Sequence, residues 1–232
     1  MSVIRLTKEF TFEAAHMLEG YDGLCREIHG HSYRLFVTIK GEPQGEFAIQ
    51  VPGEHNVLNA LAAIAAARYS GVSYGGIALG LQTFMGAIRR FEKIDTVNGI
   101  TIVDDYAHHP QEISCTLKAA KGLDFKRVWA VFQPFTYSRT AMHFDEFVDV
   151  LKIPDKCVMT EIMGSREVNT YDIYTSQLSE KIPGSVWFNT QEEVADYVVK
   201  NAKAGDLVLT MGCGDIYKSA FMMIERLKNG TV

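Results

Sequence analysis

The sequence predicts an α/β fold, a Rossmann-like and mostly parallel sheet with helices on both faces, preceded by a β-hairpin. Two observations predict it. From about residue 45 onward, short apolar runs alternate with helical patterns, which is typical of parallel strands joined by covering helices. Before that point, two runs mix β-branched and aromatic residues with polar ones, as strands do. We therefore expect a hairpin over residues 1–44 and one α/β domain over 45–232.

The elements of the predicted domain follow from where its apolar runs begin and end. We expect strands at Ile100–Asp104, Arg127–Phe132, Lys156–Glu161, Ser185–Phe188 and Asp206–Met211. We expect helices at His55–Tyr69, Gly76–Ala87, Pro110–Ala120, Arg139–Leu151, Gln191–Asn201 and Asp215–Leu227. Thr190 and Pro110 are suitable residues for helix starts.

The predicted hairpin consists of Ile4–Phe12 and Ser32–Lys40, with the turn-rich segment EGYDGLCREIHG between them. A two-stranded ribbon is marginally stable alone and must pack on something else. Its unpaired edges also make self-association through the hairpin a hypothesis to keep.

Composition excludes several classes of protein. The net charge is −5 and no basic run is present, which argues against a general nucleic-acid binder. The longest apolar stretch, near Val57–Ala67, is too short to cross a bilayer, and MSVIRLTKEF lacks the apolar core of a signal peptide. The four cysteines form no CxxC pair. We therefore expect a cytoplasmic protein without disulfides or membrane contact.

Five stretches carry a family resemblance. They are VPGEHNVLNALAAIAAA (51–67), RRFE (89–92), VDDYAHHPQEI (103–113), VFQPFTYSRT (131–140) and LTMGCGDIYK (209–218). In order and spacing they resemble the carboxy-terminal domain of the Mur ligase family. DDYAHHP together with FQPxTYSRT is similar to the members that add L-alanine to UDP-N-acetylmuramate. The resemblance covers about four-fifths of the chain, far more than a single motif.

The resemblance implies an adenine contact at the start of the first helix. His55, Asn56 and Asn59 match the family's segment there, and amide side chains can read both the donor and acceptor edges of a purine. The alternative is a capped, alanine-rich core helix. His55 could equally be a helix-start residue that packs.

The resemblance also implies contacts to the rest of ATP. Arg90 matches the arginine that reaches the phosphates, and a guanidinium engages phosphate oxygens in pairs. Its alternative is a surface arginine in a polar turn. Asp105 matches the aspartate near the ribose or phosphates, at the carboxyl end of a strand where α/β sheets place ligands. Asp104 is the less favoured partner and is expected to be structural.

Three further residues match positions that line the family's amino-acid site: Tyr106, His108 and Arg139. The resemblance implies that Arg139 pairs with the carboxylate of L-alanine. The alternative partner is a carboxylate of its own chain, such as Asp145 or Glu146. We expect His109 to be structural and to hold the turn before Pro110.

Two other features bear on the site. Phe135 stands where the family pattern has histidine, and phenylalanine can neither donate a hydrogen bond nor carry charge, which weakens amino-acid recognition. The segment GCGD (212–215) precedes a helix, but it matches no phosphate-binding signature. We expect a tight turn there.

The function implied is ATP-dependent amide bond formation in peptidoglycan precursor synthesis, with Mg²⁺. This chemistry needs a phosphate-binding loop and metal ligands. The sequence contains no G-x-x-x-x-G-K-[ST], so we expect adenine, ATP and L-alanine contacts without independent ligase activity.

The first 43 residues resemble a different family, the 6-pyruvoyl- and 6-carboxy-tetrahydropterin synthases, through FTFEAAH (10–16) and CREIHGHSY (25–33). The resemblance implies zinc ligands at His16, His29 and His31 and a catalytic thiol at Cys25. Histidines two apart on a strand face the same side, and three imidazoles suit a catalytic zinc site.

The synthase-like module is cut short after Pro43, so metal binding by the hairpin stays open and pterin catalysis is not expected. VTIKGEP ends the synthase-like strand, whereas KGEPQGEFAIQVPGEHN is ligase-like. The join therefore falls in a strand common to both patterns. A zinc-binding synthase-like protein and a non-catalytic chimera are the alternatives to a ligase domain.

Overall fold

The computed structural model describes residues 4–16, 29–41 and 46–230, and for the first two ranges only the backbone. The chain divides into two compact units. The first combines the residues up to Ala48 with Leu61–Leu79, and the second combines Ile49–Ala60 with the residues from Gly80 onward. We predicted a domain boundary between residues 44 and 45, a point that lies within the first unit. This boundary stays a prediction.

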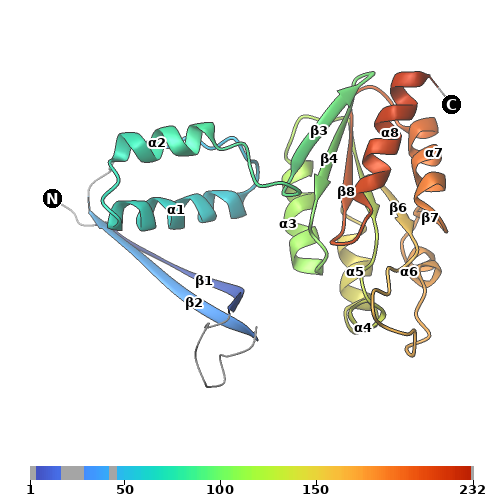
Figure 1. Ribbon diagram of the computed structural model, residues 1–232, viewed down its shortest axis with the longest axis horizontal. Helices are drawn as coiled ribbons and strands as arrows, with labels where there is room; N and C mark the ends of the chain where they lie inside the picture. The colour runs from blue at the N-terminus through green and yellow to red at the C-terminus, as the bar shows by residue number, and fades with distance from the viewer. Residues whose placement is uncertain (1–3, 17–28, 42–45, 231–232) are drawn as a thin grey trace. The chain divides into compact units, whose positions relative to one another are not determined.

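The first unit contains a two-stranded antiparallel sheet and most of a helix pair (Figure 1). Strands β1 (Ile4–His16) and β2 (His29–Gly41) pair along their whole length, from Ile4 opposite Gly41 to His16 opposite His29. This confirms the predicted hairpin, although both strands are longer than expected. Helices α1 (Glu54–Tyr69) and α2 (Tyr74–Thr83) follow.

A tight connection joins the two helices. Arg68 at the end of α1 donates to the Val72 carbonyl over 2.8 Å, and its guanidinium carbon lies 4.4 Å from the centre of the Tyr74 ring. A cation over an aromatic face is attracted by the ring quadrupole. These contacts fix the turn between α1 and α2.

The second unit is built on a six-stranded sheet with the order β3-β4-β8-β5-β6-β7. The strands are β3 (Glu92–Val97), β4 (Ile100–Asp105), β5 (Arg127–Phe132), β6 (Lys156–Thr160), β7 (Val186–Phe188) and β8 (Asp206–Met211). Only β3 is antiparallel to its neighbour, β4. The mostly parallel sheet that the sequence predicts is confirmed.

Helices cover both faces of this sheet, as predicted. They are α3 (Pro110–Lys121), α4 (Tyr137–Met142), α5 (Phe144–Val150), α6 (Thr175–Lys181), α7 (Gln191–Asn201) and α8 (Tyr217–Asn229). Helices α3, α5 and α6 pack on one face, and α7 and α8 pack on the other (Figure 1).

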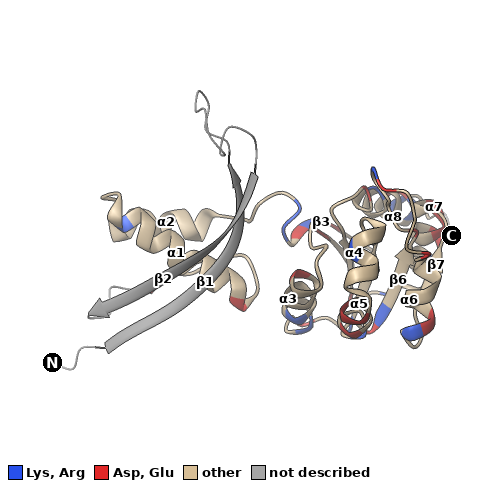
Figure 2. Cartoon of the chain, turned by 90° about the horizontal axis from the view of Figure 1, so that it is seen from below, with Lys and Arg blue, Asp and Glu red and all other residues tan. Residues whose placement is uncertain are grey.

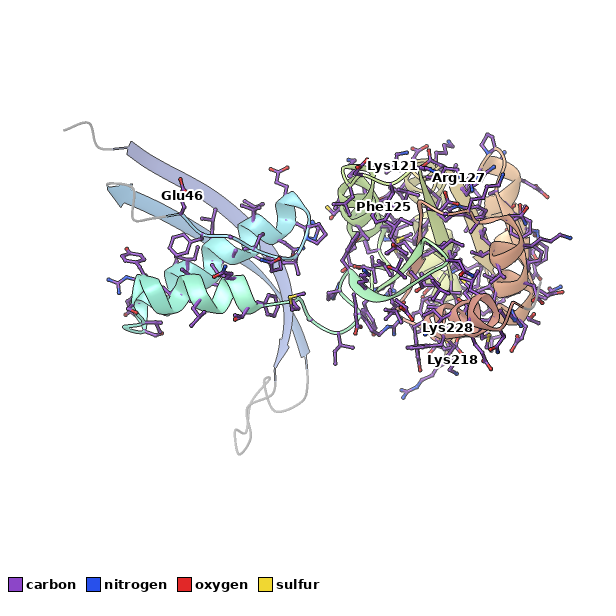
Figure 3. All side chains as sticks on the ribbon, turned by 90° about the horizontal axis from the view of Figure 1, so that it is seen from above. Glu46, Lys121, Phe125, Arg127, Lys218 and Lys228 are labelled. Atoms are coloured by element: carbon purple, nitrogen blue, oxygen red, sulfur yellow. The ribbon has the colours of Figure 1, made fainter. Side chains whose placement is uncertain are left out.

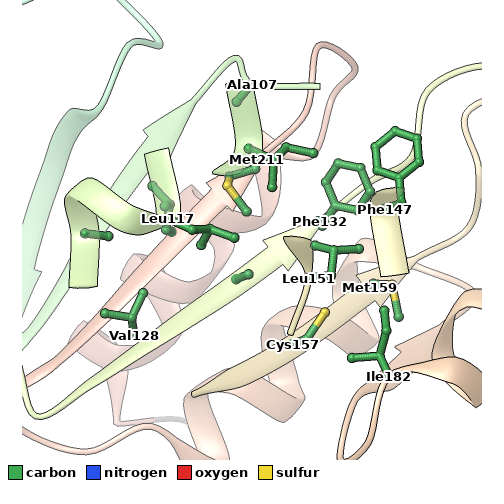
Figure 4. Close-up of a cluster of buried hydrophobic side chains, with 14 of the residues drawn as sticks. Ala107, Leu117, Val128, Phe132, Phe147, Leu151, Cys157, Met159, Ile182 and Met211 are labelled. Carbon is green, nitrogen blue, oxygen red and sulfur yellow. The ribbon is translucent and has the colours of Figure 1, made fainter. Parts of the chain in front are cut away.

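Strand β5 shows how the two faces are filled. Val128, Ala130 and Phe132 face the α3, α5 and α6 side (Figure 4), whereas Trp129 and Val131 face α7 and α8. Side chains alternate between the faces of a strand, so a strand covered on both sides needs a continuous apolar run. Burying each large apolar side chain contributes about 2 kcal/mol, which makes this sheet the stable core of the unit.

Figure 2 colours the charged residues of the sheet unit, and among the described residues only Asp104, Asp105 and Asp206 of these are buried. Asp206 shows how such a buried charge is compensated. Its carboxylate accepts from Arg127 Nε over 3.0 Å, Trp129 Nε1 over 3.0 Å and the Lys203 amide over 2.9 Å. Arg127, which is labelled in Figure 3, also forms a salt bridge with this carboxylate. Burial alone would raise the pKa of Asp206, but these hydrogen bonds lower it on balance.

Several element predictions were wrong. Strand β3 and helix α6 were not predicted, and the helix expected at Arg139–Leu151 is two helices that meet at His143. The helix expected to reach Ala87 ends at Thr83. Among the residues that the structure describes, no helix has the length and apolar character to span a membrane.

Candidate functional site

Three loops meet at the carboxyl end of the central strands. They follow β4, β8 and β5, which are neighbours in the sheet, and they begin at Tyr106, Gly212 and Gln133. Backbone hydrogen bonds join them: Gly212 donates to the Asp105 carbonyl over 3.2 Å, and Gln133 donates to the Met211 carbonyl over 3.2 Å. Open α/β sheets bind ligands at this edge, so we take it as the candidate site.

Arg89 holds two of these loops together. Its Nε lies 2.8 Å from Asp104 Oδ2, and its other nitrogens donate to the carbonyls of Gly212 (2.7 Å) and Gly214 (3.2 Å). Its guanidinium also lies 5.0 Å from the Tyr106 ring and 4.7 Å from the Tyr217 ring. Arg89 is therefore a structural residue, and the carbonyls of the GCGD turn are used to bind it.

Arg90, the residue predicted to reach the phosphates, is placed differently. Its side chain is exposed and makes no salt bridge or hydrogen bond within the described part of the chain. Its guanidinium lies 5.4 Å from the Tyr106 ring, at the edge of the site. The two arginines of RRFE thus differ. Arg89 hydrogen-bonds to residues of two loops, whereas the donors of Arg90 remain available to solvent or a ligand.

Both aspartates at the end of β4 are buried and hydrogen-bonded within the chain. Asp105 accepts from the amides of Phe91 (2.7 Å) and Ala107 (2.8 Å). Burial nevertheless raises the pKa of Asp105. Asp104 accepts from Thr210 Oγ1 over 2.6 Å and pairs with Arg89. Asp105 fixes the turn before β3, and its contact with a nucleotide stays a prediction.

The predicted amino-acid residues on the β4 side lie next to each other. The rings of Tyr106 and His108 meet edge to face at 5.5 Å. His108 Nδ1 is 2.9 Å from the Tyr106 carbonyl, which can only accept, so Nδ1 carries a proton and Nε2 remains for a ligand. His109 is the N-cap of α3, where it accepts from the Gln111 amide, which confirms its predicted structural role.

Arg139 comes from the first turn of α4. This helix is fixed by Glu167, which accepts from the Ser138 amide over 2.9 Å and from its hydroxyl over 2.5 Å. Arg139 forms no ion pair with Asp145 or Glu146; Glu146 pairs with His143 instead, over 2.8 Å. One terminal nitrogen of Arg139, Nη1, is buried without a hydrogen-bond partner.

Phe135 lies against Arg139, with its ring centre 6.0 Å from the guanidinium carbon. Its backbone bridges to Met163, and the next residue, Thr136, has a left-handed φ of 66°. The ring therefore lies beside the guanidinium and offers it no hydrogen bond.

Gln133 was not predicted as a site residue. It is 7% exposed, it directly follows β5, and its side-chain oxygen Oε1 is buried without a hydrogen-bond partner. No local sequence signal distinguishes it, because its surroundings come from a loop about 80 residues later in the chain.

The predicted adenine residues lie at the start of α1. Asn56 Nδ2 donates to the Pro52 carbonyl over 2.7 Å, and Asn59 Nδ2 lies 3.5 Å from Asn56 Oδ1. His55 is half-buried, and Asn59 is exposed. Asn56 thus helps to fix the helix start, and the adenine contact of all three residues stays a prediction.

The predicted zinc residues lie outside the described side chains. The backbone register places His16 opposite His29, and His31 opposite Ala14, whereas Cys25 falls in an undescribed segment. Among the side chains that are described, no group of three or more His, Cys, Asp or Glu residues is placed to hold a metal ion. The same search covers carboxylate ligands of magnesium, so we assign no described residue to a magnesium ion.

Comparison with known families decides the assignment. The family model "Mur ligase, glutamate ligase domain" matches residues 89–214, which include the first residues of all three site loops. The chain belongs to the Mur ligase family. A second model, 6-pyruvoyl tetrahydropterin synthase, matches residues 5–62.

Individual Mur ligases are similar over a longer stretch. A UDP-N-acetylmuramate–L-alanine ligase from Lachnospira eligens is 48% identical over 209 residues, covering 88% of this chain and 45% of the relative. One from Acetivibrio thermocellus is 45% identical over 200 residues, covering 84% and 43%. The chain therefore spans less than half the length of these relatives. Because the Lachnospira match covers 88% of the chain, it overlaps the synthase match.

Solved structures agree with this assignment. A UDP-N-acetylmuramate-alanine ligase from Thermotoga maritima superposes with a TM-score of 0.67 at 26% identity, over 84% of this chain and 41% of that one. A murein peptide ligase from Psychrobacter arcticus gives 0.56 at 30% identity, over 83% and 39%. The sheet unit is thus the carboxy-terminal domain of a Mur ligase.

Proposed function

We propose that the chain supplies the nucleotide- and amino-acid-contacting part of a UDP-N-acetylmuramate–L-alanine ligase. The observation that carries this proposal is the pair of cations at the carboxyl edge of the sheet. Arg90 forms no salt bridge within the described residues, although its charge acts on the nearby Asp105, and Arg139 has a buried donor without an acceptor. Two anionic groups, a phosphate and a carboxylate, match these two positions.

The reaction we propose has two steps. ATP first phosphorylates the carboxylate of UDP-N-acetylmuramate, which gives an acyl phosphate and ADP. The amine of L-alanine then attacks the acyl carbon. The C–N bond forms, the C–O bond to phosphate breaks, phosphate leaves with the electron pair, and the amine nitrogen releases a proton to solvent. Magnesium would neutralise phosphate charge in this chemistry.

Within this proposal each group of residues contacts a different part of the substrates. His55, Asn56 and Asn59 contact adenine, Arg90 contacts the phosphates and Asp105 acts near the ribose or phosphates. Arg139 binds the alanine carboxylate, beside Tyr106 and His108. Fixing a carboxylate by a guanidinium orients the attached amine for attack, which lowers the entropic part of the barrier. The location we propose is cytoplasmic.

The relatives contain a further half that this chain does not match, so we expect the 232 residues alone to be inactive. Addition of the complementary amino-terminal part of the Lachnospira eligens relative should restore alanine-dependent ADP release. Arg90→Ala and Arg139→Ala should each abolish this restored activity. Restoration that neither substitution affects would refute the assigned roles.

Nucleotide titration tests the binding half on the chain itself. ATP should shift the amide resonances of Asn56, Asn59 and Arg90 in a two-dimensional NMR spectrum, whereas Arg90→Ala should weaken binding. A spectrum unchanged by ATP at millimolar concentration would count against a nucleotide site in this chain.

A second function is favoured by two observations: the synthase match over residues 5–62, and the register that sets His16 opposite His29. We propose zinc at His16, His29 and His31, with Cys25 as a thiol that zinc activates. Metal analysis of the purified chain should find one zinc, lost in His29→Ala. An apo protein whose stability is unchanged by chelator would remove this proposal.

We also propose self-association through β1 and β2, since a two-stranded sheet leaves both outer edges without a strand partner in the described residues. Light scattering of the chain with and without residues 1–43 checks this. A monomer in both cases would refute it.

A further inference from the structure

The site contains two buried polar atoms that lack partners, and they are of opposite kinds. Within the described residues, only Gln133 Oε1 and Arg139 Nη1 are buried side-chain polar atoms without a hydrogen bond. Leaving such an atom unpaired is unfavourable, because a buried polar atom has lost its water without gaining a partner, so each one calls for an explanation. One is an acceptor and the other is a donor.

The orientation of the Gln133 amide follows from its neighbour Asp215. The Asp215 carboxylate accepts from Gln191 Nε2 over 2.6 Å and from Lys218 Nζ over 3.2 Å. Against the effect of burial, Lys218 and then the nearby Gln133 side chain lower the pKa of Asp215, which is the sign of a donor facing the carboxylate. An ionised carboxylate can only accept, so the NH₂ group of Gln133 must face it. The oxygen of Gln133 therefore points away from Asp215.

The two unpaired atoms lie beside consecutive residues of one loop. A Cβ at Gly214 would lie 2.6 Å from Gln133 Oε1, so only glycine leaves that oxygen room. Burial raises the pKa of the thiol of the preceding residue, Cys213, and the positive charge of Arg139 opposes this rise. Geometry links Arg139 to the same loop: its guanidinium carbon lies 6.0 Å from the Phe135 ring, Phe135 bridges to Met163, and the Cβ added at Gly214 would lie 2.6 Å from Met163 Sδ. The acceptor and the donor thus flank Gly214 and Cys213 at the same edge of the sheet.

This pairing fits one class of ligand. An α-amino acid carries a carboxylate, which requires a donor, and an amino group, whose N–H bonds require an acceptor in both its protonated and its neutral, nucleophilic form. We infer that Gln133 binds the amine of the amino-acid substrate while Arg139 binds its carboxylate. The inference rests on the proposed function and deepens it, because it adds the residue that orients the nucleophile.

A neutral acceptor suits this task better than a carboxylate would. A carboxylate next to the amine would favour the protonated form, which has no lone pair and cannot attack. The Gln133 oxygen accepts one N–H without adding charge. It therefore holds the amine while leaving its lone pair available.

Binding of three related ligands to the full chain tests the inference. L-Alanine has both groups, propionate lacks the amine, and L-alaninamide lacks the carboxylate. Gln133→Met keeps the size of the side chain but removes the acceptor. We expect this substitution to weaken L-alanine binding about tenfold and to leave propionate unchanged, since tenfold corresponds to about 1.4 kcal/mol, the value of a typical hydrogen bond.

Two control variants distinguish a wrong role for Gln133 from a wrong proposed function. Arg139→Lys should weaken L-alanine and propionate but not L-alaninamide, and Gln111→Met, on the exposed face of α3, should change nothing. If Arg139→Lys weakens L-alanine binding and Gln133→Met does not, the role of Gln133 is refuted and the proposed function stands. If L-alanine fails to bind, or binds without dependence on Arg139, both are refuted.

A measurement on the unsubstituted chain guards against a Gln133→Met variant that does not fold. The side-chain NH₂ resonances of Gln133 should shift when L-alanine is added and should stay in place with propionate. Equal shifts with both ligands would refute a contact to the amine.

Discussion

The helix pair α1–α2 and the sheet unit differ in how they bury apolar surface. All six residues of β8 are buried, whereas α1 buries none of its residues and α2 buries only Ile77. Large apolar side chains on and after these helices are exposed, among them Tyr69, Leu79, Met85 and Ile88. Ligase-like sequence covers both regions, but among the side chains that the structure describes only the sheet has its own core. Family membership therefore does not by itself provide a self-sufficient fold.

A matched pair of leucine substitutions tests this comparison with the largest expected effect. Leu117→Ala, in the core of the sheet unit, should lower the free energy of unfolding by about 3 kcal/mol because it leaves a cavity. Leu79→Ala on α2, where the side chain is 62% exposed, should change it by less than about 0.5 kcal/mol. Urea unfolding followed by the fluorescence of Trp129 and Trp187 measures both. Equal losses would mean that α2 is covered in solution.

Buried and exposed ion pairs extend the comparison within the sheet unit. Asp206→Asn should cost about 3 kcal/mol, because it leaves the Arg127 guanidinium without its buried partner. Asp196→Asn, whose side chain is 69% exposed and 3.3 Å from Arg226, should cost less than about 1 kcal/mol. Thermal unfolding at pH 7 compares them. A similar cost for both would show that burial does not determine the strength of these pairs.

The pH dependence of the Asp206 pair has a defined sign. The pKa of Asp206 is lower in the folded state, so its contribution to stability is complete above the unfolded value and is lost as the pH falls through the folded value. The unsubstituted chain should therefore lose stability below about pH 4 more steeply than Asp206→Asn. Parallel curves would contradict this.

Substitution of the two arginines of RRFE extends the comparison of buried and exposed residues to the candidate site. Arg89→Ala should lower the free energy of unfolding by about 2 kcal/mol, because Asp104 and two glycine carbonyls lose their donor. Arg90→Ala should leave stability within about 0.5 kcal/mol and reduce only nucleotide binding. Unfolding and ATP titration of both variants check this. Loss of stability in Arg90→Ala would contradict its assignment to the ligand.

The sequence predicted those parts of the fold that local patterns determine. The parallel strands are covered on both faces, so their apolar runs are continuous and easily recognised. Strand β3 is a polar edge strand with a bulge between Lys93 and Asp95, and its pattern therefore gave no clear period. The break at His143 has no glycine or proline to mark it.

The site was harder to predict because its geometry depends on distant contacts. RRFE does not reveal which arginine is internal, since that depends on a left-handed φ of 57° at Arg89 and on loops more than 100 residues later. Gln133 is distinguished only by its contact with Gly214. Residue matches can therefore identify a family, but the assignment of structural and ligand-binding roles needs the tertiary contacts.

The smallest expected effect concerns the two histidines that cap helices beside the site. The His109 and His143 rings lie 4.7 Å apart, and burial, followed by the neighbouring His143, lowers the pKa of His109. His109 thus favours the neutral form in the folded state, in which its ring accepts from the first turn of α3. Its contribution to stability is present above the unfolded pKa and is lost as the pH falls.

His109→Asn keeps an N-cap acceptor but removes the titration, so stability at pH 7.5 should stay within about 0.5 kcal/mol of the original. Between about pH 7 and pH 5 the substituted chain should lose less stability than the unsubstituted one. His109→Ala, which has no acceptor, should cost about 1 kcal/mol at pH 7.5 and serves as the control for the cap. If His109→Asn retained the full pH dependence, the titrating group would have to be another residue, and the packing of the two rings would not be what keeps His109 neutral.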